Sequence, residues 1–79
     1  MIRFRLSEQI ADKQYRDGEV LSVKRIADET GLHRMTLSRL MNQKGYSTST
    51  EVLDKLCNYF ECGISDLVEH IPENKSTDE

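Results

Sequence analysis

One face of a helix predicted over residues 34–41 carries four side chains that can contact nucleic-acid bases. They are Arg34, Met35, Ser38 and Arg39. Arginine can donate two hydrogen bonds to guanine, serine can bond either kind of partner, and a methionine side chain can touch the methyl group of thymine. Leu37 and Leu40 lie at helical spacing on the opposite face and would point into a core. A merely solvated helix is the alternative, although a methionine among basic side chains is unusual there.

Further candidates flank this face. Thr36 lies at its edge and His33 at its amino end, and both are candidates for base contact. Phosphate groups bind to the free N–H groups at helix amino termini, and two predicted helices begin near residues 22 and 48. The candidates for phosphate contact, including those in the loop after residue 41, are Ser22, Val23, Lys24, Asn42, Gln43, Lys44, Tyr46, Thr48 and Ser49. Ordinary cap or loop chemistry explains each of these single residues equally well.

The elements that must hold these side chains form a helix–turn–helix pattern over residues 23–42. Ser22 is a good cap for a first helix over residues 23–30. Ala27 is small where a second helix would cross, and Gly31 can adopt the positive φ that a short turn requires. Apolar residues that can hold both helices against a core stand at the positions that the motif requires, namely Ile26, Leu32, Leu37 and Leu40. In this motif the second helix enters the major groove of DNA.

Helical spacing of apolar residues predicts three further helices. They cover residues 6–16, 49–60 and 66–70. Thr48 and Glu51 form a capping-box pattern before the second of them, and Ser65 is expected to cap the third. Because no run of four to eight residues alternates apolar and polar side chains, we expect no β-strand. The predicted fold class is therefore all-α, with five short helices.

The length of 79 residues suits one domain, expected over residues 1–71, followed by a polar and disordered tail over residues 72–79. Hydrophobic residues make up 37% and charged residues 32% of the chain, as in a folded soluble domain. No apolar run approaches the roughly 18 residues of a membrane helix, and the amino end lacks the apolar core of a secretion signal. We therefore expect a cytoplasmic protein that does not bind membranes and is too small for an enzyme.

The charge is distributed unevenly along the chain. The net charge is −3, yet residues 22–45 carry five basic and two acidic side chains, whereas residues 46–79 carry two basic and eight acidic ones. A basic segment beside an acidic one can orient a molecule toward a polyanion such as DNA. An ordinary solvated surface would explain the same distribution.

Cys57, Cys62 and His70 raise the question of a metal or a catalytic site. Two cysteines are too few for a disulfide scaffold and are expected to be reduced thiols. The set lacks a fourth ligand, and Cys57 belongs to the apolar face of a predicted helix, so a metal site is disfavoured. Nucleophilic catalysis is disfavoured for the same reason. We predict no metal, no cofactor and no catalytic residue.

Residues 2–71 resemble the Cro/repressor-type (XRE-like) helix-turn-helix domains of bacteria and their phages. The resemblance is carried by positions 22, 26–27, 30–32, 34, 36–40 and 42–46, and by the blocks 53–62 and 65–69. It implies the compact five-helix fold of the lambda repressor, with the second and third helices as the helix–turn–helix. It also implies a transcriptional regulator, usually a repressor, that binds double-stranded DNA as a homodimer. Residues after Leu32 would read bases, and the loop after the third helix would contact phosphate.

Two positions depart from the family pattern. His33 stands where the family often has a serine or threonine cap, and Val23 stands where many members place a phosphate-binding glutamine. The alternative function is an antitoxin-like or protein-interaction module in which DNA binding is secondary. Candidates for an apolar dimerisation patch are Tyr59, Ile64, Val68 and Ile71. Burial in the core of one chain explains these four residues equally well.

Overall fold

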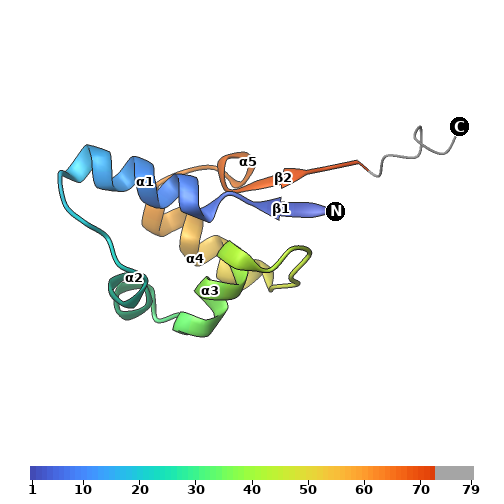
Figure 1. Ribbon diagram of the computed structural model, residues 1–79, viewed down its shortest axis with the longest axis horizontal. Coiled ribbons are helices and arrows are strands. Elements are labelled where there is room, and N and C mark those ends of the chain that lie inside the picture. Colours follow the sequence, from blue (N-terminus) through green and yellow to red (C-terminus); the bar gives the residue numbers. More distant parts are fainter. Residues whose placement is uncertain (73–79) are drawn as a thin grey trace, which may run out of the picture.

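The computed structural model describes residues 1–72, which form five helices and two short strands (Figure 1). In chain order these are β1 (Ile2–Phe4), α1 (Leu6–Asp17), α2 (Val23–Thr30), α3 (Arg34–Asn42), α4 (Thr50–Phe60), α5 (Ile64–Leu67) and β2 (Val68–His70). α1 packs against α3, α4 and α5, α2 packs against α3 and α4, and the strands extend from the α1–α5 end of the fold (Figure 1). The tail predicted over residues 72–79 lies outside the described residues from residue 73 onward.

The two strands contradict the expectation of an all-α fold without β-structure. β1 and β2 pair antiparallel, with Arg3 opposite Glu69 and Phe4 opposite Val68. The ladder continues beyond the strands, where the amide of Ile71 donates to the carbonyl oxygen of Met1 at 2.8 Å. Each strand has three residues, which is too short to show an alternating pattern, and its hydrogen-bond partner lies at the far end of the chain. The fold is therefore a five-helix domain with a small two-stranded sheet.

The end of the chain differs from the predicted helix over residues 66–70. α5 spans only Ile64–Leu67, and it begins after Gly63, whose amide donates to the Asp66 carboxylate at 3.1 Å. This bond starts the helix earlier than a Ser65 cap would, so Ser65 is not the cap. Residues 68–70 leave the helix because their backbone groups pair with β1. The chain thus turns from a helix into a strand at Val68.

The start of α4 also differs from the prediction by one residue. Ser49, and not Thr48, is the cap, since its hydroxyl accepts a hydrogen bond from the amide of Val52 at 3.2 Å. The capping-box pattern of Thr48 and Glu51 is therefore wrong by one position. α2 has the predicted bounds, and the Ser22 hydroxyl accepts from the amide of Arg25 at 3.1 Å.

All five helices contribute to one core. Its buried members are Leu6, Ile10, Leu21, Ile26, Ala27, Leu37, Leu40, Leu56, Phe60 and Leu67. Ile26 of α2 and Leu37 of α3 are fully buried, and Leu32 in the turn between these helices packs against the same cluster from a half-buried position. Burial of Leu37 and Leu40 fixes the rotation of α3 about its axis, so its opposite face points outward.

A polar network joins α2 to α4 and to the segment between α1 and α2. The hydroxyl of Tyr59 donates a hydrogen bond to the carboxylate of Glu29. Arg25 pairs with Glu29 at 3.2 Å and with Glu19 at 2.8 Å. The ammonium of Lys13 lies 5.2 Å from the centre of the Tyr59 ring. Partial burial and the bond to Glu29 raise the pKa of Tyr59 to about 12, while the bonds from Tyr59 and Arg25 lower the pKa of Glu29.

Replacing Tyr59 with phenylalanine is expected to change how stability depends on alkaline pH. Because the pKa of Tyr59 is raised in the folded state, its contribution is complete below the ordinary tyrosine value of about 10 and is lost as the pH rises toward 12. Tyr59→Phe should therefore be less stable than the wild type at pH 8, with a difference that shrinks above pH 10. Urea unfolding followed by circular dichroism from about pH 8 to 11 measures this difference.

Tyr15→Phe is the matched control. Tyr15 is almost fully exposed, and within residues 1–72 its hydroxyl forms no hydrogen bond to another side chain. Its unfolding curve should match that of the wild type at every pH. A constant difference between Tyr59→Phe and the wild type up to pH 11 would contradict the assigned role of the hydroxyl.

Candidate nucleic-acid interface

The turn between α2 and α3 is held by local hydrogen bonds. Gly31 has a φ of 79°, a left-handed conformation that glycine adopts without strain, and its amide donates to the carbonyl of Ala27 at 2.9 Å. The hydroxyl of Thr30 donates to the carbonyl of Ile26 at 2.7 Å and accepts from the amide of Leu32 at 3.2 Å. These bonds end α2 and direct the chain into α3 within three residues.

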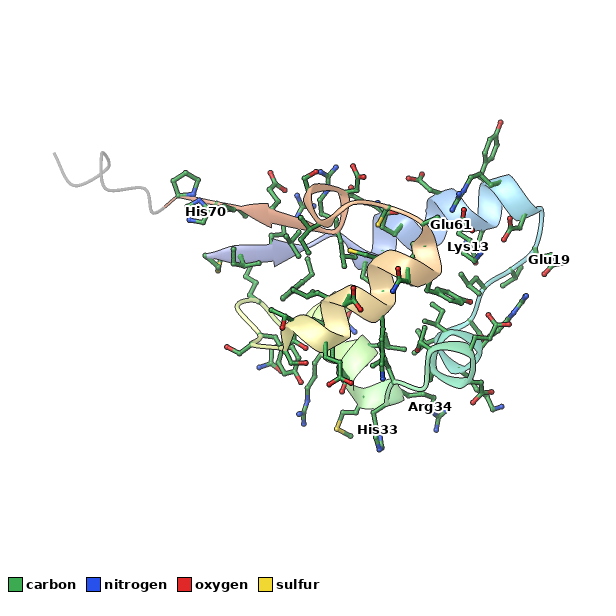
Figure 2. The ribbon with its side chains drawn as sticks, turned by 180° about the vertical axis from the view of Figure 1, so that it is seen from behind. Lys13, Glu19, His33, Arg34, Glu61 and His70 are labelled. Carbon is green, nitrogen blue, oxygen red and sulfur yellow. The ribbon has the colours of Figure 1, made fainter. Side chains whose placement is uncertain are left out.

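The outer face of α3 carries the predicted base-contacting residues. Arg34, Met35, Ser38 and Arg39 are all exposed, and Met35 has 58% of its surface open to solvent. His33 is exposed as well, whereas Thr36 is half-buried. His33 and Arg34 project from the start of α3, away from α4 (Figure 2). The structure therefore brings five of the six candidates together on one accessible surface, with Thr36 at its edge.

The start of α3 differs from the starts of α2 and α4. His33 takes the cap position with an extended backbone, and its side chain makes no hydrogen bond to the first turn. The first amides of α3 consequently have no side-chain acceptor, unlike those of α2 and α4, where Ser22 and Ser49 serve. An oxygen atom from a nucleic acid can take that place, because the free amides at a helix start attract negative charge.

The candidates for phosphate contact lie in three segments around α3. Ser22 caps α2, and Val23 and Lys24 begin it. Asn42 is the last residue of α3 and not part of the loop as predicted, whereas residues 43–46 follow this helix. Thr48 and Ser49 precede α4. Most of these side chains are exposed, and the half-buried exceptions are Val23, Tyr46 and Thr48. A shallow groove between α2 and α3, bordered by Lys24, Arg34 and Ser38, connects the first segment to the outer face of α3.

Ion pairs divide the cations of the basic segment into two groups. Lys24 pairs with Asp28 at 3.3 Å, and Arg25 pairs with two carboxylates in the network to α4. Within residues 1–72, Arg34, Arg39 and Lys44 form no ion pair. The sequence analysis did not distinguish the paired cations from the unpaired ones. The spacing of four residues from Arg25 to Glu29 could have indicated an ion pair on one helix face. The charge available to a polyanion is thus concentrated on α3 and the loop after it.

Cys57, Cys62 and His70 were the residues considered for a metal or a catalytic site. Within the part of the chain that the structure describes, no three His, Cys, Asp or Glu side chains could hold a metal ion together. Cys57 and Cys62 are half-buried free thiols at the end of α4, where the amide of Cys62 donates to the carbonyl of Cys57 at 3.0 Å. Burial raises the pKa of the Cys62 thiol, which keeps it protonated and weakly nucleophilic. His70 is exposed on β2.

The helices of residues 1–72 are all too short or too polar to cross a membrane.

Comparison with known protein families gives a match over most of the chain. The family described as the Cro/C1-type HTH DNA-binding domain matches residues 5–73, a range that includes all five helices and β2. No curated protein matches the sequence, and no solved structure does.

Proposed function

Because the chain belongs to the family of Cro/C1-type HTH DNA-binding domains, we propose that it regulates transcription, as a repressor, by binding specific sequences of double-stranded DNA. Family membership supports DNA binding itself. The observation that carries the finer proposal is the outer face of α3, where Arg34 and Arg39 are exposed and free of ion pairs within residues 1–72. Buried Leu37 and Leu40 hold this face outward.

In the proposed complex α3 lies in the major groove. Arg34 and Arg39 donate pairs of hydrogen bonds to guanine, Ser38 bonds a base edge, and Met35 contacts a thymine methyl group. His33 and Thr36 are the next contacts, at the start and the edge of the helix. The two arginines contribute most to the preference for one base over another. A good bidentate contact favours the correct base over a wrong one by about 1–3 kcal/mol.

Phosphate contacts would fix the position of α3 in the groove. We assign them to the starts of α2 and α4, to Asn42 at the end of α3 and to the loop of residues 43–46 after it. Such contacts hold the register of the protein on the duplex but carry no sequence information. Lys44 is the strongest single candidate, because it is exposed and has no acidic partner among the described residues.

We further propose that the protein acts as a homodimer. Two copies would place their recognition helices in half-sites about 10 base pairs apart, so the operator would be two-fold symmetric. A bound dimer covers the promoter and blocks the polymerase, which is how occlusion represses transcription.

The direct test is a selection of bound genomic DNA fragments with the purified protein at about 0.15 M salt, a physiological ionic strength. We expect enrichment of a two-fold symmetric site. Weak, salt-sensitive binding without an enriched sequence would contradict the proposal and would favour a protein-interaction module.

Lys44→Ala is expected to weaken binding to all DNA sequences alike. A lysine that neutralises one phosphate releases about one counterion, so its loss should lower the slope of log affinity against log salt by roughly 1. Fluorescence anisotropy titrations of the preferred site and of a scrambled duplex, each over a series of salt concentrations, measure the effect. Lys55→Ala, whose ammonium is already paired with Glu51 at 3.7 Å, is the matched control and should leave the slope unchanged. Loss of affinity on the preferred site alone would argue for base contact by Lys44.

A further inference from the structure

The turn that ends α4 brings the two cysteines of the chain together. Cys57 belongs to α4, and Cys62 is the second residue beyond the end of this helix at Phe60. The amide of Cys62 donates a hydrogen bond to the carbonyl of Cys57 at 3.0 Å. Inside this bond, the amide of Glu61 donates to the carbonyl of Asn58 at 3.4 Å. The two bonds form a Schellman motif, a helix end in which the first and the last residue of the closing turn meet.

The backbone of Glu61 closes this turn. Its φ of 54° is left-handed, and every other positive φ within residues 1–72 belongs to a glycine. A side chain disfavours this conformation because its Cβ comes close to the following carbonyl oxygen. The hydrogen bonds of the folded turn hold Glu61 in it, and they are absent from the unfolded chain. The approach of Cys57 to Cys62 is therefore a feature of the folded state and not of the local sequence alone.

The hydrogen bond between the two cysteines limits how far apart their Cα atoms can lie. The donating nitrogen is bonded directly to the Cα of Cys62, and the accepting oxygen is two bonds away from the Cα of Cys57. With the N···O distance of 3.0 Å, the two Cα atoms lie within about 7 Å of each other. A disulfide bond requires Cα atoms no farther apart than about 7 Å, so the backbone permits such a bond here.

The two thiols affect each other and can be reached from solvent. Burial raises the pKa of the Cys62 thiol, and the neighbouring Cys57 thiol raises it further through its charge and a hydrogen bond. Both are free thiols on half-buried side chains. Cys57 lines a shallow hollow beside Asp54, and Cys62 lines another beside Asp12. A small reagent can therefore approach either sulfur atom.

We propose that Cys57 and Cys62 form a site of reversible oxidation, at which a small-molecule disulfide such as oxidised glutathione converts the two thiols into a disulfide bond. The thiolate of one cysteine attacks the small disulfide, which gives a mixed disulfide and releases one small thiol. The thiolate of the other cysteine attacks the protein sulfur of the mixed disulfide and releases the second small thiol. The cysteines lose two electrons and two protons in total, and the small disulfide gains them.

The inference goes beyond the proposed function and does not depend on DNA binding. A cross-link that fits the folded state and restricts the unfolded chain raises the free energy of unfolding. The bond would fasten the end of α4 next to Phe60, which is part of the core. Glu61, beside the cysteines, lies well apart from His33 and Arg34 at the start of α3 (Figure 2). Oxidation would therefore stabilise the domain and leave the outer face of α3 open.

The test is the equilibrium of the full-length protein with mixtures of reduced and oxidised glutathione at mildly alkaline pH, in buffer and again in concentrated urea. Mass spectrometry after acid quenching measures the fraction that has lost two hydrogen atoms and carries no glutathione. We expect the equilibrium constant for oxidation to be about ten-fold or more larger in buffer than in urea, because the folded turn holds the thiols together. By linkage, the oxidised protein should resist urea unfolding by the same factor, which is about 1.4 kcal/mol for each ten-fold.

Cys57→Ser and Cys62→Ser are the matched controls. Each keeps one thiol and should stop at the mixed disulfide with glutathione, and circular dichroism shows whether each is folded. The comparison of buffer with urea needs only the wild type, so it remains decisive if a variant does not fold. An oxidation constant that is equal or smaller in buffer would overturn the inference, as would an oxidised protein no more stable than the reduced one. A mixed disulfide that accumulates on the folded wild type, or a disulfide that links two chains, would also overturn it.

Discussion

Arg39→Ala is expected to weaken binding to the preferred DNA site by about 1–3 kcal/mol and to relax the preference at one base pair. Arg39 is exposed on the outer face of α3, and within residues 1–72 its guanidinium has no ion pair that would have to break before it reached a base. The full strength of a bidentate contact is therefore available to DNA. The backbone around Arg39 is fixed, since its carbonyl accepts from the amide of Gln43 at 2.8 Å.

Binding to a library of duplexes, each changed at one base pair, measures both parts of this prediction. Arg16→Ala is the matched control, because it removes one exposed arginine from the last turn of α1. The control should lower affinity only slightly and equally for every duplex. If Arg39→Ala left affinity and preference unchanged, the outer face of α3 would not be the reading surface.

Leu37→Ala is expected to lower the free energy of unfolding by about 2–5 kcal/mol, the usual range for a fully buried leucine. Leu37 has no exposed surface, and it belongs to the core cluster to which all five helices contribute. Removing it leaves a cavity at the point where α3 meets that core. Because small domains have a total stability near the lower end of roughly 5–15 kcal/mol, a loss of about 5 kcal/mol would unfold about half of the protein at room temperature, and a smaller loss would lower its resistance to urea.

Urea unfolding followed by circular dichroism measures the change in stability. Met35→Ala, on the exposed face of the same helix, should stay within about 0.5 kcal/mol of the wild type. Should Leu37→Ala fail to fold at all, Leu37→Met keeps the prediction testable, since a swap of similar volume costs less than about 1.5 kcal/mol. Equal stability of Leu37→Ala and Met35→Ala would contradict the assigned core.

The part of the fold that the sequence predicts well is the part set by local interactions. α2 begins after Ser22 and ends at Gly31, as predicted, because a cap bond and a left-handed glycine act within four residues of each boundary. The exposed face of α3 follows from the spacing of Leu37 and Leu40 alone. The assignment of single residues to bases or phosphates stays a prediction, since it depends on how the protein meets DNA.

The part that the sequence does not predict depends on residues far apart in the chain. Val68, Glu69 and His70 continue an apolar and polar pattern compatible with a helix, and only the presence of β1 turns them into a strand. The same holds for the hydrogen bond from Tyr59 of α4 to Glu29 of α2, which joins residues 30 positions apart in the chain. Neither outcome has a local signal strong enough to decide it.

The pairing of β1 with β2 also sets an order of events in folding. Arg3 and Glu69 meet at 2.9 Å across 66 residues of chain, a long loop to close. Closing it costs about 2.5 kcal/mol more entropy than closing a four-residue turn. Helices with local contacts form sooner than such a distant pair, so we expect the strands to close last and open first. An apolar hollow beside the sheet is lined by Met1, Ile2, Phe4 and Val68 among others, and it is therefore complete only when the two strands have met. Until residues 68–70 have paired with residues 2–4, the chain does not offer this surface.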